Sequence, residues 1–111
     1  MKFYYNGKLI RTSKTHEYKF AAITAEGKCL CCSATLEGCN RGLDAYTANG
    51  KGWLRNYEEV YNGTFKETKN GWKVKDIMDL FNNSREELKE EIDKRKAYYN
   101  GIKIVELEIK A

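Results

Sequence analysis

Alternating apolar and polar residues dominate the first third of the chain, which is the period-two pattern of β-strands. The dipeptide Asn6-Gly7 favours the tight turn of a two-residue hairpin, and Glu26-Gly27 marks a second turn. The segments predicted to form strands around these turns are residues 2–5, 8–12, 18–25 and 28–34. The pattern therefore predicts four short antiparallel strands before the first helix.

Apolar residues three or four positions apart replace this alternation after residue 35, which indicates helices. Thr35 can cap a helix over residues 36–48, and Asn49-Gly50 would end it. Gly38 and Gly42 lie one turn apart in this helix. Glycine weakens a helix. Two glycines on the same side are therefore explained if that side of the helix lies close against the sheet or another backbone.

Three further helices are predicted at residues 53–61, 75–81 and 84–99, and residues 64–75 form either a minor hairpin or a loop. The last helix has the clearest signal, because Ser84 and Glu87 have the spacing of a capping box. Its apolar stripe is thin and consists of Leu88, Ile92 and Tyr99. Such a helix is half solvated or lies against a partner, and the stripe would suit a symmetric homodimer.

Residues 102–110 return to alternation, and the start of this segment is apolar on both faces. We therefore expect the final strand to insert beside the N-terminal strands and not to form a free edge. No repeat, linker or low-complexity tract divides the sequence, so residues 1–111 are predicted to form a single domain. The predicted fold class is α+β, with a four- to five-stranded, mainly antiparallel sheet and two to four helices on one face.

Composition limits the class of protein. The chain has 111 residues, of which 41% are hydrophobic and 32% charged, which is enough for one modest core. No stretch approaches the roughly 20 apolar residues of a membrane span, and the first residues lack the apolar core of a signal peptide. We therefore expect a cytoplasmic protein with no membrane partner.

Four cysteines lie close together in the sequence: Cys29, Cys31, Cys32 and Cys39. Without a secretion signal their thiols should stay reduced, and Cys29 and Cys31, two apart on one strand face, are badly placed for a disulfide. Zinc bound by His16, Cys29, Cys31 and Cys39 is an alternative, but a Cys-x-Cys pair in a strand departs from the usual loop knuckle. The favoured interpretation is small apolar fillers, with no metal and no cofactor.

Catalysis is the less favoured class of function. His16 is the only histidine and could activate Cys29 or Cys31, but nothing in their spacing requires such a pair. The glutamate pairs are adjacent on helices, so they point apart and form no acid/base pair. No phosphate-binding loop occurs in the sequence. We expect a non-enzymatic protein, with a zinc- or thiol-dependent enzyme as an alternative.

Basic charge concentrates in the N-terminal half, where residues 1–57 have a net charge of +5 against −1 for residues 58–111. Cations beside aromatic rings can bind phosphates and stacked bases, or form the centre of a protein interface. The predicted binding residues are Lys8, Arg11, Lys14, His16 and Lys19, together with the aromatic residues Trp53, Tyr57 and Trp72. The bias is mild for a nucleic-acid-binding protein, so direct nucleic-acid binding is the alternative.

Two segments carry a resemblance to a known class of proteins: residues 2–23 (KFYYNGKLIRTSKTHEYKFAAI) and residues 104–108 (IVELE). They resemble small uncharacterised proteins encoded by bacteriophages and mobile elements of Gram-positive bacteria. The resemblance supplies no catalytic or binding residue. It implies an accessory protein in the bacterial host cell that antagonises a defence system. Its partner would be a host defence protein, as for an anti-CRISPR inhibitor, or a small nucleotide signal.

Overall fold

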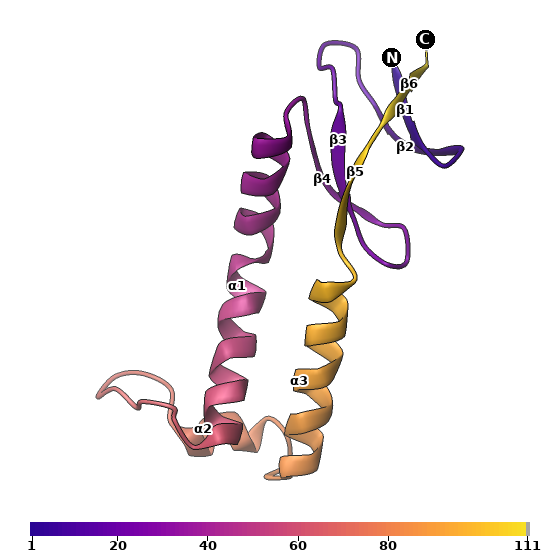
Figure 1. The fold of residues 1–111 in the computed structure, drawn as a ribbon. Coiled ribbons are helices and arrows are strands. Elements are labelled where there is room, and N and C mark those ends of the chain that lie inside the picture. The colour runs from indigo at the N-terminus through magenta and orange to yellow at the C-terminus, as the bar shows by residue number, and fades with distance from the viewer. Residues whose placement is uncertain (111) are drawn as a thin grey trace. The chain divides into compact units, whose positions relative to one another are not determined.

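The computed structural model describes residues 1–110, which form six strands and three helices (Figure 1). The strands are β1 (Lys2–Tyr5), β2 (Lys8–Thr12), β3 (Phe20–Ile23), β4 (Cys29–Ser33), β5 (Lys103–Glu106) and β6 (Glu108–Lys110). The helices are α1 (Leu36–Asn62), α2 (Val74–Asp79) and α3 (Arg85–Asn100). The predicted α+β class is confirmed. Within residues 1–110, no helix combines the length and the apolar composition needed to cross a membrane.

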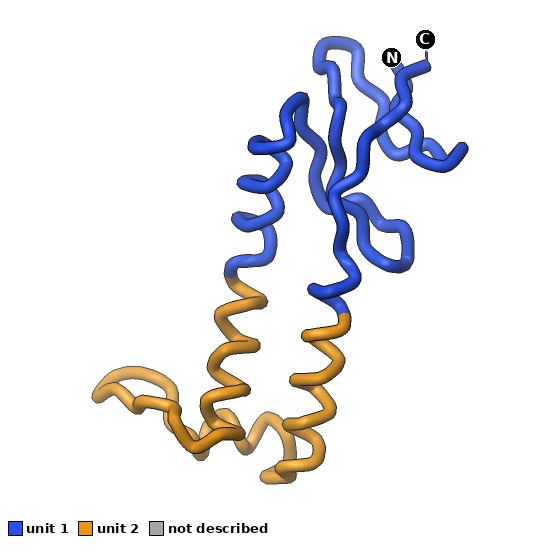
Figure 2. The backbone as a smooth tube through the Cα atoms, viewed as in Figure 1, with its two compact units in different colours: residues 1–48, 98–111 blue, residues 49–97 orange. Residues whose placement is uncertain are grey.

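The chain divides into two compact units (Figure 2). Unit 1 comprises residues 1–48 and 98–111 and contains all six strands, and unit 2 comprises residues 49–97. Both boundaries fall inside helices, α1 and α3, and not in a linker. Composition therefore gives no sign of them.

The strands form two three-stranded antiparallel sheets, in place of the single sheet of four to five strands that the sequence predicts. Sheet A has the order β2-β1-β6, and sheet B has the order β4-β3-β5. The predicted final strand is interrupted at Leu107, which is buried and whose N–H donates to the carbonyl oxygen of Lys19 at 2.8 Å. The two halves, β5 and β6, pair with the N-terminal strands β3 and β1, as predicted, but they lie at the edges of different sheets (Figure 1), so the expectation that the final strand forms no free edge is wrong.

The two faces of sheet B are covered by different elements of unit 1. Ala21 pairs with Cys32 and Val105, so these residues share the face that joins the core cluster. The buried members of that cluster are Phe3, Ala21, Ile23, Val105 and Leu107. Ala22 pairs with Cys31 on the opposite face, where helix α1 packs with Gly42 against Cys31. Apolar residues on both faces of β5 therefore reflect a covered sheet and not a central strand.

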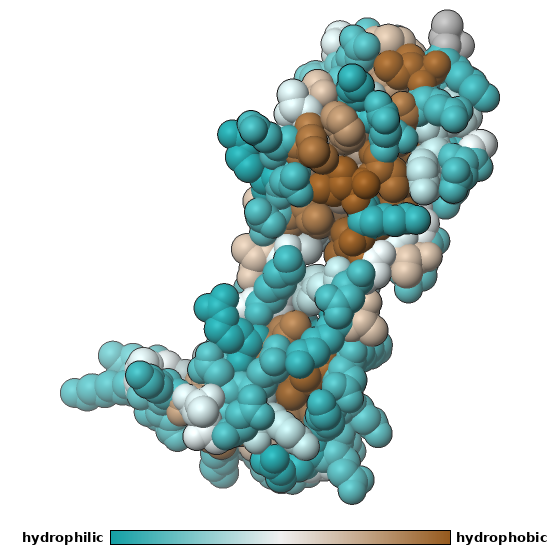
Figure 3. All heavy atoms as spheres, in the orientation of Figure 1, coloured by the Kyte–Doolittle hydropathy of each residue, from teal (hydrophilic) through white to brown (hydrophobic). Residues whose placement is uncertain are grey.

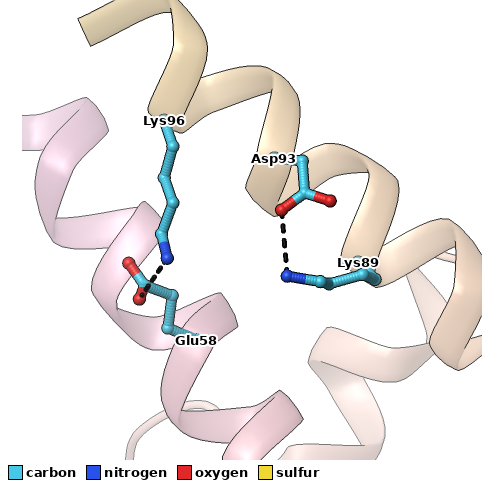
Figure 4. A network of polar contacts seen from close by, with 4 residues as sticks. All are labelled: Glu58, Lys89, Asp93 and Lys96. Atoms are coloured by element: carbon cyan, nitrogen blue, oxygen red, sulfur yellow. Dashed lines mark hydrogen bonds and ion pairs between the residues drawn. The ribbon is translucent and has the colours of Figure 1, made fainter. Parts of the chain in front are cut away.

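Unit 2 has its own core, formed by residues of three helices. The buried members are Tyr57 and Val60 of α1, Ile77 of α2, and Leu88 and Ile92 of α3. An ion pair of 3.2 Å between Lys96 and Glu58 joins α3 to α1, and Lys89 pairs with Asp93 within α3 (Figure 4). The helices α2 and most of α3 thus pack within unit 2, so the predicted placement of the helices on one sheet face is corrected.

The thin apolar stripe of α3 is used inside the chain. Leu88 and Ile92 are buried in the core of unit 2, and they are therefore not free to form the homodimer contact that the sequence suggested. Tyr99, the third member of the stripe, belongs to unit 1.

Local turn and cap signals account for most of the element boundaries. Asn6 and Gly7 both have positive φ, as the predicted hairpin turn requires, and Gly63 has positive φ after α1. Neither residue of Asn49-Gly50 has positive φ, and α1 continues through them, which merges two predicted helices into one. Residues 64–73 contain no strand, so the loop alternative is correct there.

Gly38 and Gly42 provide a test of the packing of α1 on β4. An added Cβ at Gly42 would lie 3.5 Å from Cys31 Sγ, an ordinary contact, so Gly42→Ala should stabilise the protein by about 1 kcal/mol through helix propensity. At Gly38 the Cβ would collide with Ser33 Oγ and lie 2.9 Å from Thr35 Oγ1, the atom that caps the helix. We expect Gly38→Ala to destabilise the protein by about 1–3 kcal/mol. Urea unfolding followed by far-UV circular dichroism measures both, and equal signs for the two variants would contradict this packing.

Candidate binding surface

The half-buried ring of Tyr18 organises the basic residues of unit 1. The ring packs edge-on against the buried Phe3, with 5.4 Å between the ring centroids. On Tyr18, the ring of His16 stacks at 5.9 Å and an interplanar angle of 10°, and the Arg11 guanidinium carbon lies 5.4 Å from the ring centroid. One core-anchored aromatic ring therefore holds two of the predicted binding residues.

Local hydrogen bonds position His16 in the connection between β2 and β3. Ser13 Oγ accepts hydrogen bonds from the N–H groups of Thr15 at 3.3 Å and of His16 at 2.9 Å. His16 Nδ1 also lies 3.1 Å from Thr15 Oγ1. Short hydroxyl side chains that bind neighbouring backbone N–H groups fix turns of this kind. Ser13 and Thr15 thus hold the turn that places His16 on the ring.

Arg11 reaches Tyr18 because of the register of sheet A. Arg11 is the β2 partner of Phe3, so it shares the inward face of the sheet while its end stays exposed. A hydrogen bond with the Tyr18 side chain is the main cause that raises the pKa of Arg11 above its usual value. The charged guanidinium is therefore held in one place by a ring that the core already fixes.

The other predicted cations are distributed more widely. Lys14 lies exposed in the same connection as His16, and Lys19 is exposed directly after Tyr18. Within residues 1–110, neither of these lysines nor Arg11 forms an ion pair with a carboxylate. Lys8 lies apart from them, with its Nζ 3.4 Å from the carbonyl oxygen of Gly27.

Lys8 belongs to a cavity that the sequence did not reveal. The cavity has a volume of about 300 Å³, with Ile10 and Ile23 in its wall and Lys103 as a second cation. Lys103 Nζ lies 5.8 Å from the centroid of the Tyr5 ring, which also lines the cavity. Lys103 comes from β5, and only the pairing of β5 with β3 places it here, so no local signal could have identified it.

The three predicted aromatic residues meet one another in unit 2. Trp53 lies 5.9 Å from Tyr57 and 5.1 Å from Trp72, measured between ring centroids. Tyr57 is 7% exposed and belongs to the core, whereas Trp72 is 46% exposed. Trp72 lines an open cavity of about 490 Å³ together with Asp76 and Asp79. Two carboxylates and no cation in this lining disfavour a phosphate-bearing ligand.

The two predicted groups therefore lie in different units, the cations in unit 1 and the aromatic rings in unit 2. In the view of Figure 3, hydrophilic residues cover most of unit 2, and hydrophobic residues gather mainly on unit 1. Each group is therefore a separate candidate site.

No protein-family model, curated protein or solved structure matches this chain. The assignment of a function consequently rests on the geometry of these residues.

The thiols are arranged differently from the expectation. Cys29 and Cys31 are not on one strand face, because a β-bulge in the pairing of β4 with β3 places an extra residue between them. Cys31 faces α1, where its Sγ lies 3.6 Å from the carbonyl oxygen of Cys39. Within the described residues, no three His, Cys, Asp or Glu side chains gather as metal ligands. The alternative zinc site with His16 is therefore not assembled.

Proposed function

We propose that this protein is a non-enzymatic binding protein that docks on an acidic surface of a partner protein through unit 1. The contact is made by what we call the basic surface, which consists of Arg11, Lys14 and His16 around Tyr18. The observation that carries the proposal is the stacking of Arg11 and His16 on Tyr18, whose ring rests on the core. Side chains already held in place lose less conformational entropy when a partner binds, so more of the contact energy appears as affinity.

The absence of carboxylate partners for Arg11 and Lys14 within residues 1–110 supports the same proposal. Exposed cations that form no ion pair with a carboxylate of their own unit attract and orient a complementary acidic surface. Arginine and tyrosine are also enriched among the residues that dominate the energy of protein interfaces. A nucleic acid is the less favoured partner, because its binding usually depends on more phosphate contacts than these few cations provide.

The resemblance of residues 2–23 and 104–108 to phage and mobile-element proteins defines the proposed biological role. The partner would be a protein of a bacterial defence system, and the bound chain would block it by covering its surface. A nucleotide signal is not favoured as the occupant of the cavity beside the exposed Trp72, because that cavity carries carboxylates. No catalytic step is required for inhibition by occupation.

Charge reversal on the basic surface tests this proposal. We expect the double variant Arg11→Glu and Lys14→Glu to bind its partner roughly 10- to 100-fold more weakly, because two attractive contacts become repulsive. The matched control is Lys66→Glu with Lys69→Glu, two exposed cations of unit 2 that receive the same change of charge. Immobilised wild type and both variants are compared by affinity capture from a lysate of the cells that produce the chain, followed by binding titration of the captured protein.

The wild type and the Lys66 and Lys69 control should capture the same protein, and the capture should survive nuclease treatment and weaken as salt rises. Equal capture by the Arg11 and Lys14 variant would contradict the basic surface. Loss of all capture after nuclease treatment would favour nucleic-acid binding instead.

A further inference from the structure

An extra residue in strand β4 brings two cysteine side chains together. Ala22 of β3 pairs with Cys31, whereas the next residue, Ile23, pairs with Cys29, so Leu30 has no partner in the ladder. In a regular strand, residues three positions apart point to opposite faces. The bulge removes that difference for Cys29 and Cys32. Their Sγ atoms lie 3.3 Å apart.

The surroundings separate this pair from the other two thiols. Cys29 and Cys32 are half-buried and pack against the core cluster of unit 1, on the face that carries Ala21 and Ile23. Cys31 lies on the opposite face, toward Cys39 of α1. A direct reaction between sulfurs is thus favoured by geometry within the Cys29 and Cys32 pair.

Arg11 supplies a positive charge beside the two sulfurs. Burial, together with the hydrogen bond with Cys29, raises the pKa of Cys32 to about 12, although the charge of Arg11 acts in the opposite direction. Cationic side chains near a thiol favour the thiolate, which is the reactive form. The pair therefore combines contact between sulfurs with an electrostatic aid to ionisation, against a cost of burial.

We propose that Cys29 and Cys32 form a dithiol site that a peroxide oxidises to an intramolecular disulfide, which a thiol reductant reverses. One sulfur, as thiolate, attacks an oxygen of hydrogen peroxide and becomes a sulfenic acid, and the hydroxide released takes up the proton that the thiol lost. The second sulfur then displaces the sulfenic oxygen and forms the S–S bond, and its proton leaves with that oxygen as water. Two thiols and one peroxide thus yield one disulfide and two waters, with the peroxide reduced by two electrons.

The two sulfurs need only a short approach to reach bonding distance. A disulfide has an S–S length of about 2 Å, so the sulfurs of Cys29 and Cys32 must approach each other by roughly 1.3 Å. Both belong to a single strand at a bulge, where ladder pairing is already interrupted. This inference goes beyond the proposed binding function and does not depend on it.

The experiment treats the folded full-length chain with hydrogen peroxide, quenches the reaction with acid, alkylates the free thiols and measures the intact mass. Two variants separate the thiol pairs: Cys31→Ala with Cys39→Ala retains only the proposed pair, and Cys29→Ala with Cys32→Ala removes it. We expect the first variant and the wild type to lose two hydrogen atoms and to regain them with dithiothreitol. The second variant should form an intramolecular disulfide at least tenfold more slowly.

Fragmentation of the wild-type peptide that contains all four cysteines identifies the linkage even if replacing the buried Cys39 prevents folding. A Cys29–Cys32 bond is the expected result. A Cys31–Cys39 bond, equal oxidation rates in the two variants, or wild-type oxidation that stops at sulfinic acid would overturn the proposal.

Discussion

Replacing Phe3 by alanine should lower the free energy of unfolding of unit 1 by about 3–5 kcal/mol. Phe3 is fully buried and belongs to the core cluster together with Ala21 and Val105. Removing the ring takes away apolar contacts and leaves a cavity that the short strands around it cannot fill. The loss also reaches the basic surface, because the ring of Tyr18 packs on Phe3. The measurement is urea unfolding by circular dichroism, with hydrogen exchange of the amides in β1, β3 and β5.

Ile109 provides the control for Phe3, because it is the β6 partner of Phe3 in sheet A but is 44% exposed. We expect Ile109→Ala to change the free energy of unfolding by less than about 1 kcal/mol. The core assignment of unit 1 would be contradicted if the two variants were equally stable.

Replacing Ile77 by alanine should lower the free energy of unfolding of unit 2 by about 2–5 kcal/mol. Helix α2 has only six residues, and an isolated helix of that length is not stable in water. It is held by Ile77, which is fully buried in a cluster with Val60 of α1 and Leu88 of α3. Truncating this side chain therefore removes the main contact that joins α2 to its neighbours.

Tryptophan fluorescence reports this change specifically, because the two tryptophans of the chain, Trp53 and Trp72, both lie in unit 2. The control is Leu80→Ala, directly after α2, whose side chain is 54% exposed and should contribute less than about 0.5 kcal/mol. An Ile77→Ala urea midpoint indistinguishable from that of Leu80→Ala would exclude the described core of unit 2.

The first hairpin turn and the N-caps of two helices could be predicted from residues that lie close together in the sequence. The Asn6-Gly7 turn has the predicted positive φ values. The N-cap hydroxyls act as predicted, since Thr35 Oγ1 accepts the N–H of Gly38 at 3.0 Å and Ser84 Oγ accepts that of Glu87 at 3.2 Å. These features depend on conformational preferences within a few residues, which a single sequence contains. The second half of the predicted capping box is not formed, because the N–H of Ser84 donates to the carbonyl oxygen of Phe81 at 2.9 Å and the carboxylate of Glu87 accepts from Asn82 Nδ2 at 3.1 Å.

Features that depend on the tertiary fold were not predictable in this way. Asn49-Gly50 is permitted in a left-handed cap but does not require one, and packing of α1 on both sides of the dipeptide favours the continuous helix. Alternation along residues 102–110 is unchanged where the chain passes from one sheet to the other at Leu107. The sequence pattern of residues 28–34 likewise gives no sign of the extra residue that brings Cys29 to Cys32.

The candidate site was predicted in part. Arg11 and His16 were identified by their charge and spacing, and the structure brings both to one ring. The ring itself, Tyr18, was read only as a strand residue, because its role depends on packing against Phe3. Tyr57 is predicted to be a binding residue but is buried in the core. Its place in a helical pattern does not show whether an aromatic side chain is buried or exposed.

Native mass spectrometry of the chain drawn directly from the cells that produce it tests the central claim, that unit 1 acts by binding an acidic partner protein. The proposed function predicts a complex with one protein that dissociates as the ionic strength is raised and is absent for the Arg11 and Lys14 charge-reversal variant. A wild-type chain that carries no protein partner, or a complex that the variant retains in full, would contradict it.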